Sequence, residues 1–344
     1  MNVDTPNKQH QHNLIIGFWL LGCAAVVYFM IVVGGMTRLT QSGLSMVEWD
    51  PIMGIIPPIG EAAWQEVFAK YKTSPEYLKV NAGMSLAAFK GIFYWEYGHR
   101  VLGRVIGMVY LLPLLLFLAR GMVPKRWYAK LFGLFVLGGL QGLMGWYMVK
   151  SGLVDVPRVS QYRLTAHLGL ALVIFAYMLW FAMDFLRGEQ RVHVASRAYL
   201  KSTLLVVFVV FIMMLSGGFV AGTKAGFIMN TFPMMNGQWL PDGWLAMTPA
   251  WRNLFENAIT VQLVHRCIAI VVVVAVIISF IISLKQRFKA VNGWVVAAMI
   301  VQVNLGIMAL VMKVPLALGA AHQAGAVALF AASLYVAHVA RKST

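Results

Sequence analysis

Long apolar runs separated by short polar connections make up most of this sequence. A helix needs about 20 apolar residues to cross the hydrocarbon of a bilayer, and eight runs are long enough. Since no water satisfies backbone groups inside lipid, such runs predict helices. The sequence therefore predicts an all-α integral membrane protein with eight transmembrane helices. They are expected at approximately residues 14–33, 101–119, 129–149, 164–186, 199–220, 258–284, 291–312 and 316–340.

Composition agrees with lipid as the main solvent. Hydrophobic residues make up 60% of the 344 residues and charged residues 12%, whereas soluble domains carry about 25% charged residues. The net charge of +16 would suggest nucleic acid as a partner for a soluble protein. Here the basic residues lie in short connections between apolar runs, as the positive-inside rule requires. We therefore expect membrane lipid, and no nucleic acid, as a partner.

Lysine and arginine positions predict the orientation. They gather after the second, fourth and sixth runs and at the C-terminus, so these faces and both termini are expected to be cytoplasmic. The first run shows no small-residue cleavage site and is interpreted as a retained helix. No arginine-rich presequence precedes it, which favours a bacterial inner-membrane protein. The basic residues are Arg120, Lys125, Arg126, Lys130, Arg187, Arg191, Arg197, Lys201, Lys285, Arg287, Lys289, Arg341 and Lys342.

Two connections on the opposite, outer side are long. The first, residues 34–98, mixes aromatic and charged positions and predicts amphipathic helices on the outer surface. The second, residues 221–257, is rich in Gly, Pro, Met and Trp. Long loops are usually functional or disordered, and both are too aromatic for disorder.

Marker residues recur in the same order in the two halves of the chain. A Gly-Gly pair ends one run, a His-Arg pair opens the next, and a glutamine and a histidine follow in the two after that. This predicts a parallel repeat of two four-helix bundles, residues 1–190 and 191–344. The markers are Gly34, Gly35, His99, Arg100, Gln141 and His167, then Gly217, Gly218, His265, Arg266, Gln302 and His322.

Four of the eight histidines are candidates for chemistry. They are predicted in the first turns of the second, fourth, sixth and eighth helices, at similar depth on the outer side. Ionisable residues inside a membrane are costly and indicate function; the alternative is a hydrogen-bonded packing role, which repetition at matched places disfavours. The four are His99, His167, His265 and His322, whereas His10, His12, His193 and His338 are expected to be solvated or interfacial.

Two histidines per half suit haem. Haem iron takes histidine as an axial ligand, and helical bundles build cofactor sites from facing helices. A position near the positive end of a helix would also keep the imidazole neutral and ready to bind iron. Zinc would need three or four compact ligands, and a channel would need polar residues through the whole depth.

Neighbouring polar residues refine this hypothesis. Arg38, Arg100 and Arg266 could pair with the two haem propionates, or their side chains could extend to the interface. Glu96 stands three residues before His99, where the second half has Gln262, and this spacing puts each on the face of its histidine. The difference suggests a reaction site in the first half and an electron-carrying haem in the second. The alternative is that Glu96 merely favours the helix dipole.

Two long runs and two short motifs resemble haem A synthase of the proteobacterial and mitochondrial branch. The runs are GGMTRLTQSGLSMVEWDPIMGIIPP at residues 34–58 and PEYLKVNAGMSLAAFKGIFYWEYGHRVLGR at residues 75–104. The motifs are the His-Arg pair at residues 265–266 and Ala-His-Gln at residues 321–323. The resemblance covers nearly the whole chain.

This resemblance implies an enzyme that oxidises the C8 methyl group of haem O to a formyl group through successive hydroxylations. It implies that His99 and His167 flank the substrate haem, with Glu96 as the essential carboxylate, and that His265 and His322 hold a haem b cofactor. Haem O synthase would supply the substrate and an external electron donor the electrons. Some relatives carry cysteine pairs in the outer loops, which this chain lacks, and Ala88 stands where relatives often have a carboxylate.

The haem sites are expected towards the outer, periplasmic side of the membrane, and homo-oligomerisation is left open. Two alternatives remain. A dihaem electron-transfer protein would place haems at both depths to move electrons across the bilayer, whereas both pairs lie on one side here. A haem carrier would suit a parallel repeat, but Pro113 is the main mid-depth break in the helices.

Overall fold

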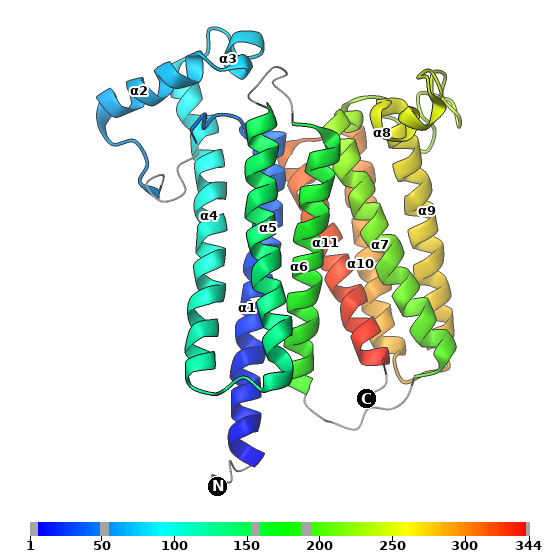
Figure 1. Cartoon of the computed structure of the whole chain (residues 1–344). Helices are drawn as coiled ribbons and strands as arrows, with labels where there is room; N and C mark the ends of the chain where they lie inside the picture. The colour runs from blue at the N-terminus through cyan, green and yellow to red at the C-terminus, as the bar shows by residue number, and fades with distance from the viewer. Residues whose placement is uncertain (1–5, 49–54, 153–158, 188–194, 342–344) are drawn as a thin grey trace.

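A computed structural model describes residues 6–48, 55–152, 159–187 and 195–341. In this part of the chain there is no strand, only an isolated bridge between Met235 and Gln238. Within these described residues, eight helices are long and apolar enough to cross a membrane, which confirms the predicted fold class. They stand side by side, with the N- and C-termini at the same end (Figure 1). These helices are α1 (Pro6–Leu39), α4 (Leu86–Ala119), α5 (Tyr128–Gly152), α6 (Gln161–Arg187), α7 (Arg197–Thr223), α9 (Ala258–Ser283), α10 (Lys289–Val311) and α11 (Leu316–Ala340).

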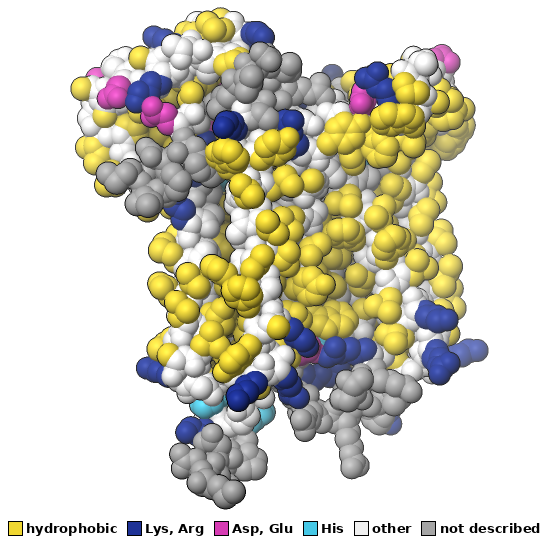
Figure 2. Space-filling view, in the orientation of Figure 1, with side chains coloured by type: hydrophobic (Ala, Val, Ile, Leu, Met, Phe, Trp, Pro, Cys, Tyr) yellow, Lys and Arg dark blue, Asp and Glu magenta, His cyan; other side chains and the backbone are white. Residues whose placement is uncertain are grey.

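The outward faces of these helices are apolar. Large side chains such as Phe18, Leu112 and Phe132 are exposed, and apolar side chains cover the middle of the molecule in Figure 2. Lysine and arginine side chains lie around the lower end, near the termini, whereas those at the upper end are mixed with acidic side chains (Figure 2). This distribution is the one the positive-inside rule gives for a multi-pass membrane protein.

Four helices form the centre of the bundle. Helix α1 packs against α6 and α11, and α7 packs against the same two helices. The others lie outside: α4 on α1, α5 on α6, α9 on α7, and α10 on α11. Each half thus uses similar helix contacts. The repeat of residues 1–190 and 191–344 stays a prediction.

Helix α4 begins much earlier than predicted, at Leu86 rather than near residue 101. Ser85 caps it, because its Oγ accepts a hydrogen bond from Ala88 N at 3.2 Å and so satisfies a free N–H of the first turn. Phe89 and Phe93 in the added turns are buried. The expectation that the His-Arg pair at 99–100 opens this helix is therefore wrong. The two Gly-Gly pairs likewise lie inside α1 and α7 and do not end them.

The first outer connection forms a lobe over the start of α4. As predicted, it contains amphipathic helices, α2 (Gly60–Lys72) and α3 (Pro75–Lys79). Trp64, Phe68 and Tyr71 from α2 pack with aromatic side chains of α4 in a small separate core. In Figure 1 the lobe projects sideways beyond α4.

The second outer connection is ordered by buried asparagines. Asn253 Nδ2 donates to Met247 O at 2.8 Å, and Asn257 Nδ2 donates to Gly243 O at 2.8 Å. Asn257 also caps α9. The short helices of this connection are η3 (Ala225–Phe227), η4 (Ala250–Arg252) and α8 (Asn253–Glu256).

At the inner end, His338 contradicts the expectation of a solvated or interfacial side chain. It is 1% exposed, because α11 packs along α6 and places its Nε2 2.8 Å from Asp184 Oδ1. Arg187 Nη1 donates to His338 O at 3.0 Å, and Arg341 pairs with Asp184. His10 is exposed and His12 partly exposed on α1. His193, Arg191 and Lys342 lie outside the described residues.

We predict that the stability of the outer lobe falls as pH rises. Burial raises the pKa of the Glu76 carboxyl in α3 from 4.5 to about 7, although Tyr71 Oη donates to it at 3.3 Å. A raised pKa means that folding favours the protonated acid, so its contribution is complete below about pH 4.5 and is lost as pH passes about 7.

Hydrogen exchange of α2 and α3 between pH 5 and 8, corrected for intrinsic rates, measures this effect. Glu76→Gln, which cannot ionise, should remove the dependence. Protection that stays constant or increases with pH in the unmodified protein contradicts the prediction.

Candidate functional site

The four candidate histidines lie at one depth. Each is about 18 to 20 residues from the inner end of its helix, which corresponds to about 27–30 Å of α-helix. The hydrocarbon core is about 30 Å thick, so helix length places all four near the boundary that lies farther from the termini. His99 lies in the middle of the long α4, so the predicted support from a helix terminus is wrong for this residue.

The histidines form two pairs, one in each half. His99 on α4 lies close enough to His167 on α6 for charges on the two rings to interact. The same holds for His265 on α9 and His322 on α11. Among the described residues there is no cluster of three or more His, Cys, Asp or Glu side chains that could hold a bare metal ion. Two imidazoles are enough for haem, because the porphyrin supplies the other four iron ligands.

A glycine on the adjacent helix faces the first histidine of each pair. A Cβ atom added at Gly34 of α1 would lie 3.2 Å from His99 Nε2, and one added at Gly217 of α7 would lie 3.6 Å from His265 Cε1. The first residue of each Gly-Gly marker therefore leaves room for an imidazole.

The second histidine of each pair has a matching arrangement, which sequence reasoning missed. A Cβ at Gly145 of α5 would lie 3.2 Å from His167 Cε1, and one at Gly306 of α10 would lie 2.7 Å from His322 Cε1. Each glycine follows a marker glutamine by four residues, so both face the same side of the helix. This repeated Gln-x-x-x-Gly spacing was readable in the sequence.

The marker glutamines contact the same histidines. Gln141 Nε2 donates to His167 O at 3.1 Å, and Gln302 Nε2 donates to His322 O at 2.9 Å and lies 3.0 Å from its Nδ1. The Oε1 atom of each glutamine is buried without a hydrogen-bond partner in the described structure. A buried acceptor of this kind is costly unless a further group completes it.

Glu96 ties the first outer loop to α4. It is 2% exposed, and its Oε2 accepts hydrogen bonds from Ser45 Oγ at 2.7 Å and Met46 N at 2.8 Å. Its Oε1 pairs with Arg100 Nη2 at 2.5 Å. Arg100 also donates to Met46 O and Glu48 O, both at 2.9 Å.

Gln262 ties the second outer loop to α9 in the equivalent place. Its Nε2 donates to Ala225 O at 2.7 Å and Ile228 O at 2.6 Å. Arg266 Nη2 donates to Gln262 Oε1 and to Met229 O, both at 3.1 Å. Both halves therefore fasten an outer loop with an arginine and a partner four residues before it.

This comparison gives a structural reason for the Glu96–Gln262 difference. The first loop presents a backbone N–H group, and the carboxylate of Glu96 accepts a hydrogen bond from it. The second loop presents backbone carbonyl groups, and the amide of Gln262 donates hydrogen bonds to them. The difference alone therefore does not assign the reaction to the first half. Glu96 is also not a first-turn residue, so its dipole interpretation is wrong.

The arginines differ in what they contact. Arg38 Nη2 donates to Ala221 O at 3.1 Å and Gly222 O at 3.5 Å, which joins the end of α1 to the end of α7. Arg266 Nε is buried without a hydrogen-bond partner in the described part of the chain. Propionate binding by Arg38, Arg100 and Arg266 stays a prediction, and Arg266 retains a donor for it.

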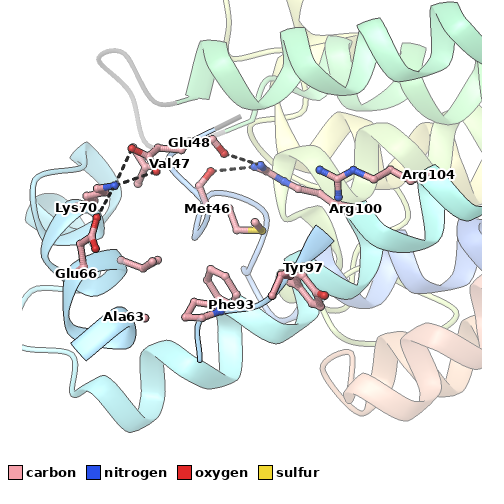
Figure 3. A pocket seen from close by; sticks show the side chains of 13 residues that line it. Met46, Val47, Glu48, Ala63, Glu66, Lys70, Phe93, Tyr97, Arg100 and Arg104 are labelled. Carbon is pink, nitrogen blue, oxygen red and sulfur yellow. Dashed lines mark hydrogen bonds and ion pairs between the residues drawn. The ribbon is translucent and has the colours of Figure 1, made fainter. Parts of the chain in front are cut away.

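A cavity of about 250 Å³ lies between the lobe and α4. Figure 3 shows Arg100 reaching Met46 and Glu48 at its wall, with Arg104 beside it. His99 faces Gly34 of α1, whereas the cavity is lined by α4, α2 and the first outer loop. Sequence reasoning did not find this cavity, because its walls are far apart in the chain.

Comparison with known proteins agrees with this geometry. The family described as cytochrome oxidase assembly protein matches residues 17–334. Heme A synthase of Nitrosospira multiformis is 50% identical, with 98% of this chain and 97% of the relative covered. Heme A synthases of Parvibaculum lavamentivorans (44%; 98% and 97% covered) and Nitrosomonas eutropha (47%; 96% and 95% covered) are also similar.

The chain belongs to the haem A synthase family. Three structural features of this family member are compatible with a haem at each site. Each site offers two imidazoles from opposite helices, glycines leave space beside every ring, and buried amide oxygens lack partners next to His167 and His322. Neutral imidazole is the form that binds iron.

We predict that Gly306→Ala lowers the haem content of the purified protein. The new methyl group would lie 2.7 Å from His322 Cε1, so the ring must move away from its position. Gly145→Ala, with a 3.2 Å approach to His167, should have a smaller effect on the first-half site.

Gly142→Ala is the matched control, since nothing lies within 4 Å of its added Cβ on α5. The haem-to-protein ratio and the visible absorption spectrum are the measurements. A Gly306→Ala protein with the ratio and spectrum of the control contradicts the assignment of His322.

Proposed function

We propose that this protein is a haem A synthase, which oxidises the C8 methyl group of haem O to the formyl group of haem A. The observation that carries the proposal is the pair of histidines repeated at one depth in each half. Near full-length relatives with 43–50% identity bear the name Heme A synthase, and this supports the reaction.

Each half has a separate task in this proposal. His99 and His167 flank the substrate haem, and His265 and His322 hold haem b, with Arg266 Nε available to a propionate. Bound haem b supplies one-electron transfer between an external donor and the substrate site. The division at residues 190 and 191 follows these tasks.

Glu96 acts beside the substrate. It stands one turn from His99 on α4, which places it over the first-half site. Three donors hold its carboxylate still, so it can orient a water molecule or move a proton at the methyl group being oxidised. The same contacts keep the first outer loop closed over the site.

The site faces the periplasmic side of the bacterial inner membrane in this proposal. Haem O enters from the lipid, with its farnesyl tail among apolar side chains, and haem O synthase is the supplier. An external reductase provides electrons. A homo-oligomer is compatible with these assignments and is not required by them.

The electron-transfer alternative is less well supported. A protein that carries electrons across the bilayer needs haems near both surfaces. All four histidines stand at the outer hydrocarbon boundary, and His338 at the inner end is engaged by Asp184. The carrier alternative has no observation of its own.

Co-expression with a haem O synthase, in a host that lacks haem A, tests the proposal. Haem extraction and mass detection should show haem A or its hydroxymethyl intermediate. Glu96→Gln should lower conversion about 100-fold or more, because it removes a proton-transfer group and leaves an amide N–H facing one of the donors around it. Glu61→Gln, which alters the contacts of an exposed carboxylate with Lys90 and Gln65, is the control.

Haem content separates chemistry from loop closure. If Glu96 takes part in the reaction, its variant keeps bound haem while conversion falls. Parallel loss of haem and conversion would show a structural role only. Haem O left unchanged by the unmodified protein, with haem b bound and a working reductant, would favour the electron-transfer alternative.

A further inference from the structure

A serine hydroxyl contacts one of the four histidines. Ser216 on α7 directly precedes Gly217, and its Oγ lies 2.7 Å from His265 Nδ1. The same Oγ donates a hydrogen bond to Met213 O at 2.7 Å, one turn earlier in α7. Serine often bonds back to a carbonyl of the preceding turn in this way.

Proton counting favours one tautomer of His265. A hydroxyl has one proton, and when Met213 O receives it, none is left for the ring nitrogen. The contact with His265 therefore requires Nδ1 to be the donor and Ser216 Oγ the acceptor. A neutral ring with its proton on Nδ1 has its lone pair on Nε2, which is the form that binds iron through Nε2.

The first half lacks this hydroxyl. The sequence Ser216-Gly217-Gly218 of α7 corresponds to Val33-Gly34-Gly35 of α1, so valine stands in the place of serine. No hydrogen bond to the His99 ring occurs among the described residues. His265 is thus oriented by the hydroxyl of Ser216, whereas its counterpart His99 is held by packing.

We propose that Ser216 is a positioning residue that fixes His265 as a permanent haem ligand, and that its replacement by Val33 leaves the His99 site able to exchange haem. The inference rests on the proposed function, in which the second half keeps a cofactor and the first half admits a substrate and releases a product. Partners that orient a ligating histidine strengthen binding about 10- to 100-fold.

Haem B titration of the haem-depleted, full-length protein tests the role of Ser216. Ser216→Ala should weaken binding at the second-half site about 10- to 100-fold. It should also raise the midpoint potential, because a less basic imidazole stabilises ferric iron less. Ser216→Thr keeps the hydroxyl and should restore both values.

Ser202→Ala is the matched control on the same helix. Its hydroxyl contacts Tyr199 O at 2.8 Å and Ser279 Oγ at 3.2 Å, away from any histidine of the site. Equal weakening by Ser202→Ala and Ser216→Ala would show general destabilisation and overturn the proposal. Unchanged affinity and potential in Ser216→Ala would overturn it too.

The converse substitution, Val33→Ser, tests the exchangeable site. In a protein that lacks His265 and His322, it should slow haem dissociation from the first half about 10-fold or more. An unchanged dissociation rate would contradict the exchange part of the proposal.

His265→Ala separates this inference from the proposed function. If that variant binds haem B as tightly as the unmodified protein, the haem b assignment itself fails, and with it the basis for a role of Ser216. If His265→Ala loses haem while Ser216→Ala keeps it, only the role of Ser216 fails.

Discussion

Every polar group inside a bilayer must find its partner within the protein, and this constraint shapes both the fold and the site. It requires helices for the spans, because only they satisfy their own backbone groups in lipid. It also explains why buried charged side chains at the two ends of the bundle are paired. At the inner end Asp184 meets His338, and at the outer boundary Glu96 meets Arg100.

The outer loops depend on the same constraint. In each half, one pair of side chains on a helix satisfies several backbone groups of an outer loop. Glu96 accepts from the N–H of Met46, whereas Gln262 donates to the carbonyl of Ala225. Each pair lies on the helix that carries a histidine, so the same helix segment holds an outer loop and a candidate haem ligand.

The sequence predicted the spans well, because apolar length is a local signal. The repeated markers located four histidines that the structure brings to one depth, and their role as haem ligands stays a prediction. The sequence misplaced the start of α4, since the protruding turns are amphipathic and their cap, Ser85, lies outside the apolar run. It also misjudged His338, whose partner Asp184 is 154 residues away. The Ser216–Val33 difference was visible in the sequence, but its meaning required the 2.7 Å contact with His265.

The central claim is that two histidine pairs hold two different haems. Haem identity in two double variants, purified from cells that make haem B and haem O, tests it most directly. The protein without His99 and His167 should keep haem B and lose haem O and haem A. The protein without His265 and His322 should lose haem B and keep substrate haem. Loss of both haems in both variants, or of neither, would contradict the account.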